Sequence, residues 1–414
     1  MTLLRGWFGI ALWQRVLAGL VLGVALGLLV PAAAPWIAFL GEIFVRLIRM
    51  LVVPIVLVTV AAGVASLADP RRLGSIGGRA VLLFVATTVI AVSVGIAVGL
   101  LLQPGAHASL GGAAPHALGP ARTVYEQLVG IVPLNLFDAL AKGDMLAILF
   151  AAILVGAGTV AAGEAGAPFA ALLSSASAVL LHIVRFAMEF TPFGVLALVA
   201  NAVAANGLAV FGSIGTLALC VVLGSLVQML LVHSLLVGLV ARVPVHRFFR
   251  GIVDALVVAF STASSSATLP VAMRVAQDNL GIARPVASVV LPLGASIGKD
   301  GTAMYVGLLS VFGLQVFGVP LQVDTLGIVL LTAVLAAFGT APIPSASLFM
   351  LAAVLAAAGV APEQTALIVG FILPFDRLLD MTRTVPSASA NLAVAAVVAR
   401  WEGAIEPPAH SPEL

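Results

Sequence analysis

The chain has 414 residues, of which 62 % are hydrophobic and 9 % are charged, and its formal net charge is +2. Soluble globular proteins carry about 25 % charged residues, so this composition excludes a soluble domain. The alternating apolar and polar residues of a membrane β-barrel are absent, and we predict an all-α polytopic membrane protein. Basic residues lie mainly at the ends of apolar segments, which gives no reason to expect a nucleic-acid partner. The single cysteine, Cys220, excludes an internal disulfide.

Six apolar segments, each long enough to cross a bilayer, occupy the first part of the chain. They run over residues 12–30, 36–67, 80–102, 145–162, 169–205 and 210–240. The first resembles a signal peptide, but Arg15 interrupts it, and we interpret it as a retained membrane helix. Lys and Arg residues gather on the side of the membrane that holds the N-terminus, which predicts that both termini are cytoplasmic. Heavy use of Ala, Gly and Arg favours a bacterial inner (plasma) membrane.

The rest of the chain is less regular and repeats one plan. Residues 248–314 and 325–400 each contain a short apolar arm, a small-residue polar tip, a second arm and a longer helix with ionisable residues. Arms this short do not cross a bilayer and return, so we expect a re-entrant helical hairpin before each helix. One intact helix separates the hairpins, which predicts inverted repeats, with a substrate site where hairpin tips and broken helices meet.

A polar stripe runs through the last of these helices. At helical period its members share one face of an otherwise apolar span: Asp376, Asp380, Arg383, Thr384, Ser387 and Asn391. Ionised groups at bilayer depth cost roughly 2.5 to 3.5 kcal/mol each on insertion scales, so the stripe indicates a buried ligand site. A purely structural ion pair between Asp380 and Arg383 is the alternative.

The helix of the first repeat carries a second polar position. Proline and glycine residues between positions 292 and 301 disfavour a continuous helix. Lys299, Asp300 and Thr302 occupy the expected break, where unwound carbonyl groups need a ligand, an ion or protein donors. We expect both charged helices to be broken at the depth of the site.

Five motifs in this order resemble the glutamate/aspartate transporter family, the dicarboxylate and amino acid:cation symporters. They are RLIRMLVVPIV from Arg46, GIVPLNLFDALAKGDMLAILF from Gly130, ASSSATLPVAMRVA from Ala263, KDGTAMY from Lys299 and DMTRT from Asp380. The resemblance covers nearly the whole chain. It implies eight transmembrane helices plus two re-entrant helical hairpins, a homotrimer in the lipid bilayer, and an elevator-type motion that carries substrate across.

The resemblance also implies a division of the chain into two kinds of domain. Residues 1–70 would form scaffold helices 1 and 2, residues 75–105 would form helix 3 of the transport domain, and residues 121–206 would form scaffold helices 4 and 5. Residues 210–400 would complete the transport domain with helix 6, hairpin 1, helix 7, hairpin 2 and helix 8. Residues 401–414 would be a cytoplasmic tail.

By position, the resemblance assigns the substrate contacts to eight residues: Ser264, Ser265, Ser266, Thr302, Asp380, Arg383, Thr384 and Ser387. Asp380 would hold the substrate ammonium, and Arg383 would bind the side-chain carboxylate in a bidentate manner. Because an aspartate suits an ammonium group, we predict an acidic amino acid, aspartate or glutamate, as substrate. The gate of the second hairpin would contain Pro342, Pro344, Ser345 and Ser347.

The chain departs from the family pattern at the positions associated with sodium, which are Thr87, Thr88, Gly298, Asp300 and Asn391. The family motif Asn-Met-Asp-Gly-Thr begins here with Gly298 and Lys299. Ser387 and Asn391 stand for an asparagine and an aspartate, and Phe84 stands for a tyrosine. We interpret these positions as vestigial and assign neither a metal site nor a cofactor.

Lys299 adds a positive charge next to these changes. The acids Asp300, Asp376 and Asp380 are matched in number by the bases Lys299, Arg377 and Arg383. We therefore predict that Lys299 acts as a built-in cation, that Asp300, Asp376 and Asn391 share in the charge compensation, and that sodium dependence is weak or absent. Proton coupling stays open, and so does a simple pairing of Lys299 with Asp300.

Other functions are compatible with parts of the pattern. A C4-dicarboxylate symporter driven by sodium or protons would share the fold. An intramembrane hydrolase would use a Ser–Lys dyad of Ser264–Ser266 with Lys299, but it leaves Asp380 and Arg383 without a task. A channel would need a lined pore on a symmetry axis. The histidines are not predicted metal ligands, and His182 and His233 stand alone in apolar segments, where packing is the commoner role.

Overall fold

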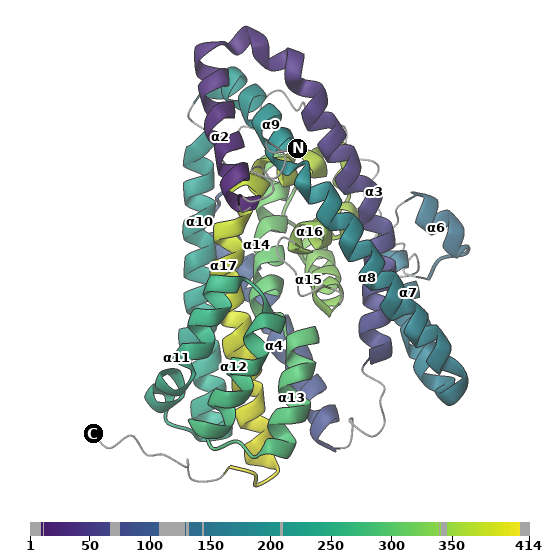
Figure 1. Cartoon of the computed structure of the whole chain (residues 1–414), viewed down its shortest axis with the longest axis vertical. Coiled ribbons are helices and arrows are strands. Elements are labelled where there is room, and N and C mark those ends of the chain that lie inside the picture. Colours follow the sequence, from purple (N-terminus) through teal and green to yellow (C-terminus); the bar gives the residue numbers. More distant parts are fainter. Residues whose placement is uncertain are drawn as a thin grey trace.

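The structure is a computed structural model that describes residues 12–66, 75–106, 132–142, 145–207, 210–338 and 346–405, with residues 10, 129 and 340. Within these residues the fold is all-helical, which confirms the predicted class, and one isolated bridge between Ile282 and Ile405 is the only extended pairing. Figure 1 shows long helices that run side by side along the long axis of the molecule.

The first half of the chain contains nine described helical elements. These are α2 (Leu12–Leu29), η1 (Pro31–Ala33), α3 (Ala34–Ser66), α4 (Ser75–Leu102), α6 (Leu136–Lys142), α7 (Met145–Ala161), η2 (Gly163–Gly166), α8 (Ala167–Glu189) and α9 (Thr191–Asn206). The segment predicted as one span over residues 169–205 is two helices. The break has a local cause, since Pro192 lies in the first turn of α9, where a missing backbone N–H is tolerated and the ring presets a new helix start.

The second half begins with one long helix that changes its winding. The α-helical part is α10 (Val210–Val227), and it continues into the π-helical segments η4 (Gln228–His233) and η5 (Leu236–Ala241). Then follow α11 (Val245–Thr262), α12 (Ser265–Asp278), α13 (Arg284–Ile297), α14 (Asp300–Val316), α15 (Val323–Phe338), α16 (Ala346–Ala357) and α17 (Pro362–Trp401).

Two helical hairpins stand where the sequence predicts them. The arms α11 and α12 contact each other along their length, and α15 and α16 do the same. The first tip is tight, because Ala263 adopts a left-handed conformation with φ 50° and Ser264 then caps α12 by accepting a hydrogen bond from the Ala267 N–H. The helical hairpins are thus confirmed, whereas their re-entry from opposite sides of a membrane stays a prediction.

Membrane-spanning helices are recognised here by length and composition. Two helices among the described residues, 76–102 and 214–241, are long and apolar enough to cross a bilayer. They become three if α2 and the start of α3, which meet at an angle of 115°, count as one bent span. The predicted total of eight spans stays a prediction.

Two pairs of helices pack closely because glycine residues lie where they meet. On α2, Gly19, Gly23 and Gly27 bring the helix so near to α9 that a β-carbon at any of them would meet a backbone oxygen within 2.7 Å. On α4, a β-carbon at Gly95 would lie 2.0 Å from the Met304 carbonyl oxygen of α14. Each pair therefore packs backbone against backbone over several turns.

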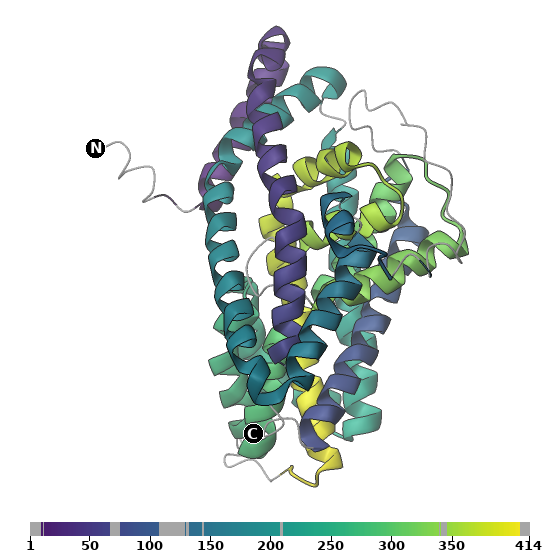
Figure 2. The same ribbon diagram turned by 90° about the vertical axis from the view of Figure 1, so that its right-hand side faces the viewer.

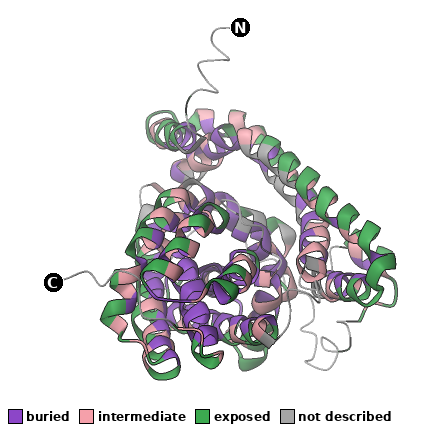
Figure 3. Ribbon diagram, turned by 60° about the horizontal axis from the view of Figure 1, so that its bottom comes forward, coloured by how far each residue is buried: buried purple, intermediate pink, exposed green. Residues whose placement is uncertain are grey.

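The helices gather into two neighbouring groups. In the first, α3 packs against α7, α8 and α9, and α2 packs against α9. In the second, α17 lies among α10, α11, α13, α14 and α16. Figure 2 shows α3 and α8 along one flank, and Figure 3 shows the buried residues gathered mainly on the inner faces of the compact second group. Within the first group, Arg15 is 4 % exposed and its Nη1 lies 2.6 Å from Glu189 Oε2.

A short segment of the chain, between α9 and α10, connects the two groups. Helix α9 ends at Asn206 and is capped by Gly207, whose φ of 64° and ψ of −156° favour a residue without a β-carbon. Residue 210 already belongs to α10. Two residues, 208 and 209, lie between them and outside the described part of the chain.

Candidate functional site

The break between α13 and α14 sets the position of the site. Helix α13 ends at Ile297, and α14 starts at Asp300, with Lys299 in a non-helical conformation at φ −112° and ψ 40°. Gly301 allows the first turn of α14 to approach α17, since a β-carbon there would lie 1.7 Å from the Arg383 carbonyl oxygen. The Gly301 N–H donates to Ser387 Oγ at 3.1 Å. The predicted break in this helix is confirmed.

The last helix differs from the prediction. We expected a second broken helix, but α17 is continuous over 40 residues, Pro362–Trp401, and that expectation is wrong. Pro386 lacks a backbone N–H donor without ending the helix, and α17 packs against α10, α11, α13 and α14. The polar stripe therefore lies on one continuous helix and faces the break in the neighbouring helix.

Asp380 and Arg383 form the centre of the site. Both side chains are at most 4 % exposed, and Arg383 Nη2 donates to Asp380 Oδ1 at 2.7 Å. Arg383 Nη1 donates to Thr302 Oγ1 at 2.5 Å, and the guanidinium carbon lies 5.1 Å from the centre of the Tyr305 ring. The remaining guanidinium donor, Nε, has no hydrogen-bond partner among the described residues.

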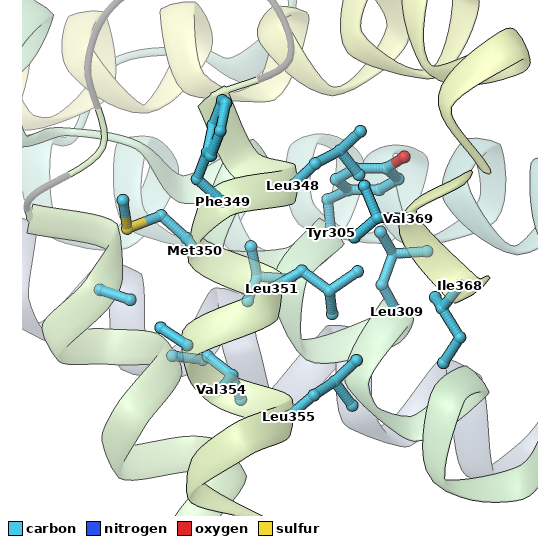
Figure 4. Packing of buried hydrophobic residues seen from close by; sticks show 14 of the residues in the cluster. Tyr305, Leu309, Leu348, Phe349, Met350, Leu351, Val354, Leu355, Ile368 and Val369 are labelled. Atoms are coloured by element: carbon cyan, nitrogen blue, oxygen red, sulfur yellow. The ribbon is translucent and has the colours of Figure 1, made fainter. Parts of the chain in front are cut away.

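Tyr305 joins this centre to a further carboxylate. Its hydroxyl donates to Asp376 Oδ1 at 2.9 Å, and Asp376 Oδ2 has no partner within the described part of the chain. Figure 4 shows Tyr305 in an apolar surrounding that includes Leu309 of α14, Leu348 of α16 and Val369 of α17. The second hairpin thus packs directly beside the ring that supports Arg383.

Lys299 is buried at the same place. Its side chain is 3 % exposed, so it faces neither bulk water nor lipid. Its electrostatic partners are Arg383, which repels the ammonium, and Asp380, which attracts it. No described carboxylate lies within ion-pair distance of Lys299, so the structure gives no pairing of Lys299 with Asp300. No hydrogen bond joins it to Ser264, Ser265 or Ser266 either, which leaves the Ser–Lys dyad without support.

The remaining stripe residues differ in what they face. Thr384 Oγ1 donates back to the Asp380 carbonyl oxygen of its own helix at 2.7 Å. Ser387 holds the first turn of α14, as described above. Asn391 lies against the end of α13, where a β-carbon at Gly298 would be 2.0 Å from Asn391 Oδ1, and that oxygen has no partner in the described residues.

The structure describes the first hairpin tip completely and the second only in part. In the first tip Ser265 is buried, Ser264 is half-buried and Ser266 is exposed. In the second tip Pro342, Pro344 and Ser345 lie outside the described residues, so their predicted role as a gate has no structural counterpart here. Ser347 is fully buried at the start of α16, and its hydroxyl has no partner among the described residues.

Asp300 lies in a separate polar cluster that joins the predicted positions Thr87 and Thr88 to residues that the sequence did not predict. Its carboxylate is fully buried, and Oδ1 accepts hydrogen bonds from Thr87 Oγ1 at 3.0 Å and Thr88 Oγ1 at 3.4 Å. On the other side, Gln228 Nε2 lies 3.3 Å and His233 Nε2 lies 3.5 Å from Oδ2. His233 Nδ1 is 3.1 Å from Ser389 Oγ of α17.

Sequence reasoning missed Gln228, His233 and Ser389 for a physical reason. Gln228 and His233 are five residues apart, which is about 140° around an α-helix, so an α-helical reading puts them on different faces. The π-helical winding of η4 widens the turn and brings both to Asp300. Ser389 was not predicted because it does not lie on the helix face that contains Asp380 and the rest of the polar stripe.

The surroundings of Asp300 do not fit a sodium ion as the structure arranges them. Sodium prefers oxygen ligands, but Asp300 Oδ2 faces two nitrogen atoms, Nε2 of Gln228 and Nε2 of His233. At another vestigial position, Asn391 supplies a neutral amide where the resemblance places a carboxylate. Within the described residues, no group of three or more His, Cys, Asp or Glu side chains could hold a metal ion.

Similarity to known proteins covers almost the whole chain. Residues 12–401 match the sodium:dicarboxylate symporter family. A proton/sodium-glutamate symport protein of Geobacillus stearothermophilus is 32 % identical over 403 residues, 94 % of each chain. A C4-dicarboxylate transport protein of Anaeromyxobacter sp. (strain K) is 32 % identical, with 96 % of this chain and 91 % of the relative aligned. A proton/glutamate-aspartate symporter of Escherichia coli is 31 % identical over 94 % of this chain and 92 % of its own. Together with the broken helix, the hairpins and the buried Asp380–Arg383 pair, this establishes that the chain belongs to the sodium:dicarboxylate symporter family.

Proposed function

We propose that this protein is a secondary transporter of acidic amino acids, aspartate or glutamate, in a bacterial plasma membrane, and that it is not an enzyme. The observation that carries the proposal is the buried guanidinium of Arg383, which keeps one N–H group without a partner beside Asp380. An unpaired charged donor is costly in a buried site. It is the position where a carboxylate ligand would complete the hydrogen bonds.

Recognition would work by exchange of partners. In the structure Asp380 and Arg383 bind each other across one turn of α17. A bound amino acid would direct its ammonium group to Asp380 and a carboxylate to the planar guanidinium, which binds carboxylates in a bidentate manner. Thr302 and Tyr305 hold the guanidinium in place, one through its hydroxyl and one through its ring.

The charge of the site favours an amino acid over a plain dicarboxylate. Lys299 and Arg383 bring two positive charges when both are protonated, and Asp376 and Asp380 bring two negative charges, so the buried group is balanced. An acidic amino acid presents an ammonium group to Asp380, whereas a C4-dicarboxylate would place an anionic group against this buried carboxylate. Relatives with both substrate classes in their names share the fold, so the second class is the alternative that the experiment must exclude.

Lys299 would provide the positive charge that a coupling ion would otherwise bring to the site. When it is protonated, the buried Lys299 would place a positive charge at the site, where Asp380 attracts it and Arg383 repels it. Binding would therefore need no sodium, and transport would run by exchange or by coupling to protons. Helices α4 and α10–α17 would move together as the transport domain against a scaffold of α2, α3 and α7–α9, in the manner of an elevator and within a homotrimer.

Uptake of radiolabelled aspartate into proteoliposomes tests this proposal. With sodium replaced by choline, uptake by the wild-type protein should persist, and unlabelled glutamate should compete while succinate should not. Trans-stimulation by internal aspartate would identify a carrier and exclude a channel. Loss of uptake in choline would reject sodium independence, and effective competition by succinate would favour the C4-dicarboxylate alternative.

Lys299→Met tests the built-in cation directly. The variant should bind aspartate at least tenfold more weakly in choline, because the site then loses the positive charge of Lys299. Lys142→Met is the matched control, since Lys142 is an exposed residue paired with Asp138 on α6. An unchanged affinity in Lys299→Met would show that Lys299 does not compensate charge at the site.

A further inference from the structure

The cluster around Asp300 differs from the site described above in its chemistry. Asp300 and Lys299 are neighbours in sequence, yet Lys299 interacts with α17, while the Asp300 carboxylate points to α4 and η4. Asp300, Gln228, His233 and Thr88 are all fully buried. A buried carboxylate without compensation would cost several kcal/mol, so its surroundings must stabilise the charge.

Four protein donors provide this stabilisation. Oδ1 receives the two threonine hydroxyl groups of α4, and Oδ2 faces the amide nitrogen of Gln228 and Nε2 of His233. The orientation of the amide follows from charge, because the reverse orientation would place Gln228 Oε1 against the carboxylate. The same argument gives His233 a proton on Nε2, and Nδ1 then accepts from the Ser389 hydroxyl.

Gln228 and His233 reach Asp300 because the backbone that carries them is π-helical. The i→i+5 bonds of η4 rotate His233 toward the face of Gln228, and π-helical turns inside longer helices are frequent at functional sites. Ser389, fully buried on α17, fixes the other side of the imidazole. The π-helical winding of η4 therefore places both Gln228 and His233 beside Asp300.

We propose that Gln228 and His233 are specificity-determining residues that take the place of a sodium ion beside Asp300. The inference deepens the proposed function and rests on its sodium independence. In this arrangement Asp300 keeps its charge and its position at the start of α14. Hydrogen-bond donors of the protein stabilise the carboxylate, as a bound metal ion would do in a sodium-driven transporter. The ion specificity of the chain is then set in η4, at a distance from the substrate contacts.

Three variants test the proposal. His233→Ala and Gln228→Ala each remove one donor, and Gln228→Glu replaces a donor by a second carboxylate of almost the same shape. Ser225→Ala is the matched control, because Ser225 is buried on the same helix and its hydroxyl has no partner among the described residues. Each variant is purified as the full chain, and aspartate binding and thermal stability are measured in choline chloride and in sodium chloride at equal ionic strength.

The wild-type protein and Ser225→Ala should show the same affinity and the same Tm in both salts. The three test variants should bind aspartate at least tenfold more weakly in choline, and sodium should restore the affinity and raise the Tm in a saturable manner. Gln228→Glu should respond most strongly, since two facing carboxylates attract a cation. If His233→Ala or Gln228→Ala does not fold in either salt, the result for Gln228→Glu decides.

The inference is overturned if Gln228→Glu and the foldable alanine variants respond to sodium no more than Ser225→Ala does. A wild-type protein that itself requires sodium would instead overturn the proposed sodium independence. The two failures are therefore distinguished by the wild-type measurement in choline.

Discussion

At the residue scale, Arg383 is the most constrained side chain of the site. One nitrogen binds Asp380, another binds Thr302, and the plane stacks on Tyr305, so only Nε lacks a partner among the described residues. Lysine keeps the charge but presents neither the planar fork nor the stacking surface. The position therefore requires arginine for geometry and not only for charge.

Arg383→Lys should weaken aspartate binding about 10- to 100-fold, because hydrogen bonds to charged groups contribute about 1.5 to 3 kcal/mol and tenfold corresponds to about 1.4 kcal/mol. Equilibrium binding to purified protein measures the effect. Arg274→Lys serves as control, since Arg274 forms an exposed ion pair with Asp254 at 2.8 Å. An affinity within a factor of two of the wild type would remove Arg383 from the substrate contacts.

How far the residues of the site could be predicted depends on helical period. The face that holds Asp380, Arg383 and Ser387 follows from 3.6-residue spacing, and the structure places all three at the break before α14. Gln228 and His233 could not be found in this way, because π-helical winding depends on tertiary contacts and not on a local pattern. Thr384 was assigned to the substrate, but its hydroxyl binds the backbone of its own helix.

At the element scale, the contact between α4 and α14 depends on the absence of side chains. The Gly95 position meets the Met304 carbonyl oxygen, and Gly307 of α14 meets Val92 of α4 in return. Gln315 adds two hydrogen bonds at the far end, donating to the Gly99 carbonyl oxygen and accepting from the Gly105 N–H, both at 2.9 Å. Because Thr87 and Thr88 lie on α4 and Asp300 lies on α14, this packing holds the Asp300 cluster together.

Gly95→Ala should lower the free energy of unfolding by about 1 to 3 kcal/mol, the usual cost of overpacking. Gly78→Ala on the same helix is the control, since a β-carbon there meets nothing within 4 Å and alanine is the better helix former. Thermal unfolding in detergent compares the two. A Tm of Gly95→Ala equal to that of Gly78→Ala would contradict the backbone contact between α4 and α14.

The elements themselves were largely predictable, and the exceptions have local causes. Apolar length and polar tips indicated both hairpins, and the proline and glycine residues between positions 292 and 301 indicated the break at Lys299. Residues 169–205 were read as one span because hydropathy does not register Pro192 as a helix start. The last helix was expected to be broken, but α17 accommodates Pro386 since neighbouring helices support it on several sides.

At the scale of the whole molecule, a leucine packs onto a glycine where the two helix groups meet. Leu198 of α9 lies against Gly370 of α17, where a β-carbon would be 2.7 Å from Leu198 Cδ1, and also against Gly41 of α3. In the proposed elevator motion this contact would have to slide, and glycine at position 370 places no side chain in its way.

Gly370→Val should slow transport at least tenfold while leaving aspartate affinity within about twofold, because the added branch obstructs sliding but lies away from Arg383. Uptake rates in proteoliposomes and equilibrium binding in detergent separate the two effects. Gly212→Val is the control, since a β-carbon at Gly212 meets nothing within 4 Å. Equal uptake by both variants would speak against a moving interface at this position.

The connection after Gly207 limits what such a movement can be. Three peptide steps join residue 207 to residue 210, and an extended chain covers at most about 3.6 Å per step, so the adjoining ends of α9 and α10 stay within roughly 11 Å of each other. In the proposed movement of the transport domain, the start of α10 would therefore stay within this distance of α9 throughout. Larger displacements relative to the scaffold would be open only to parts of the domain that lie farther from Gly207.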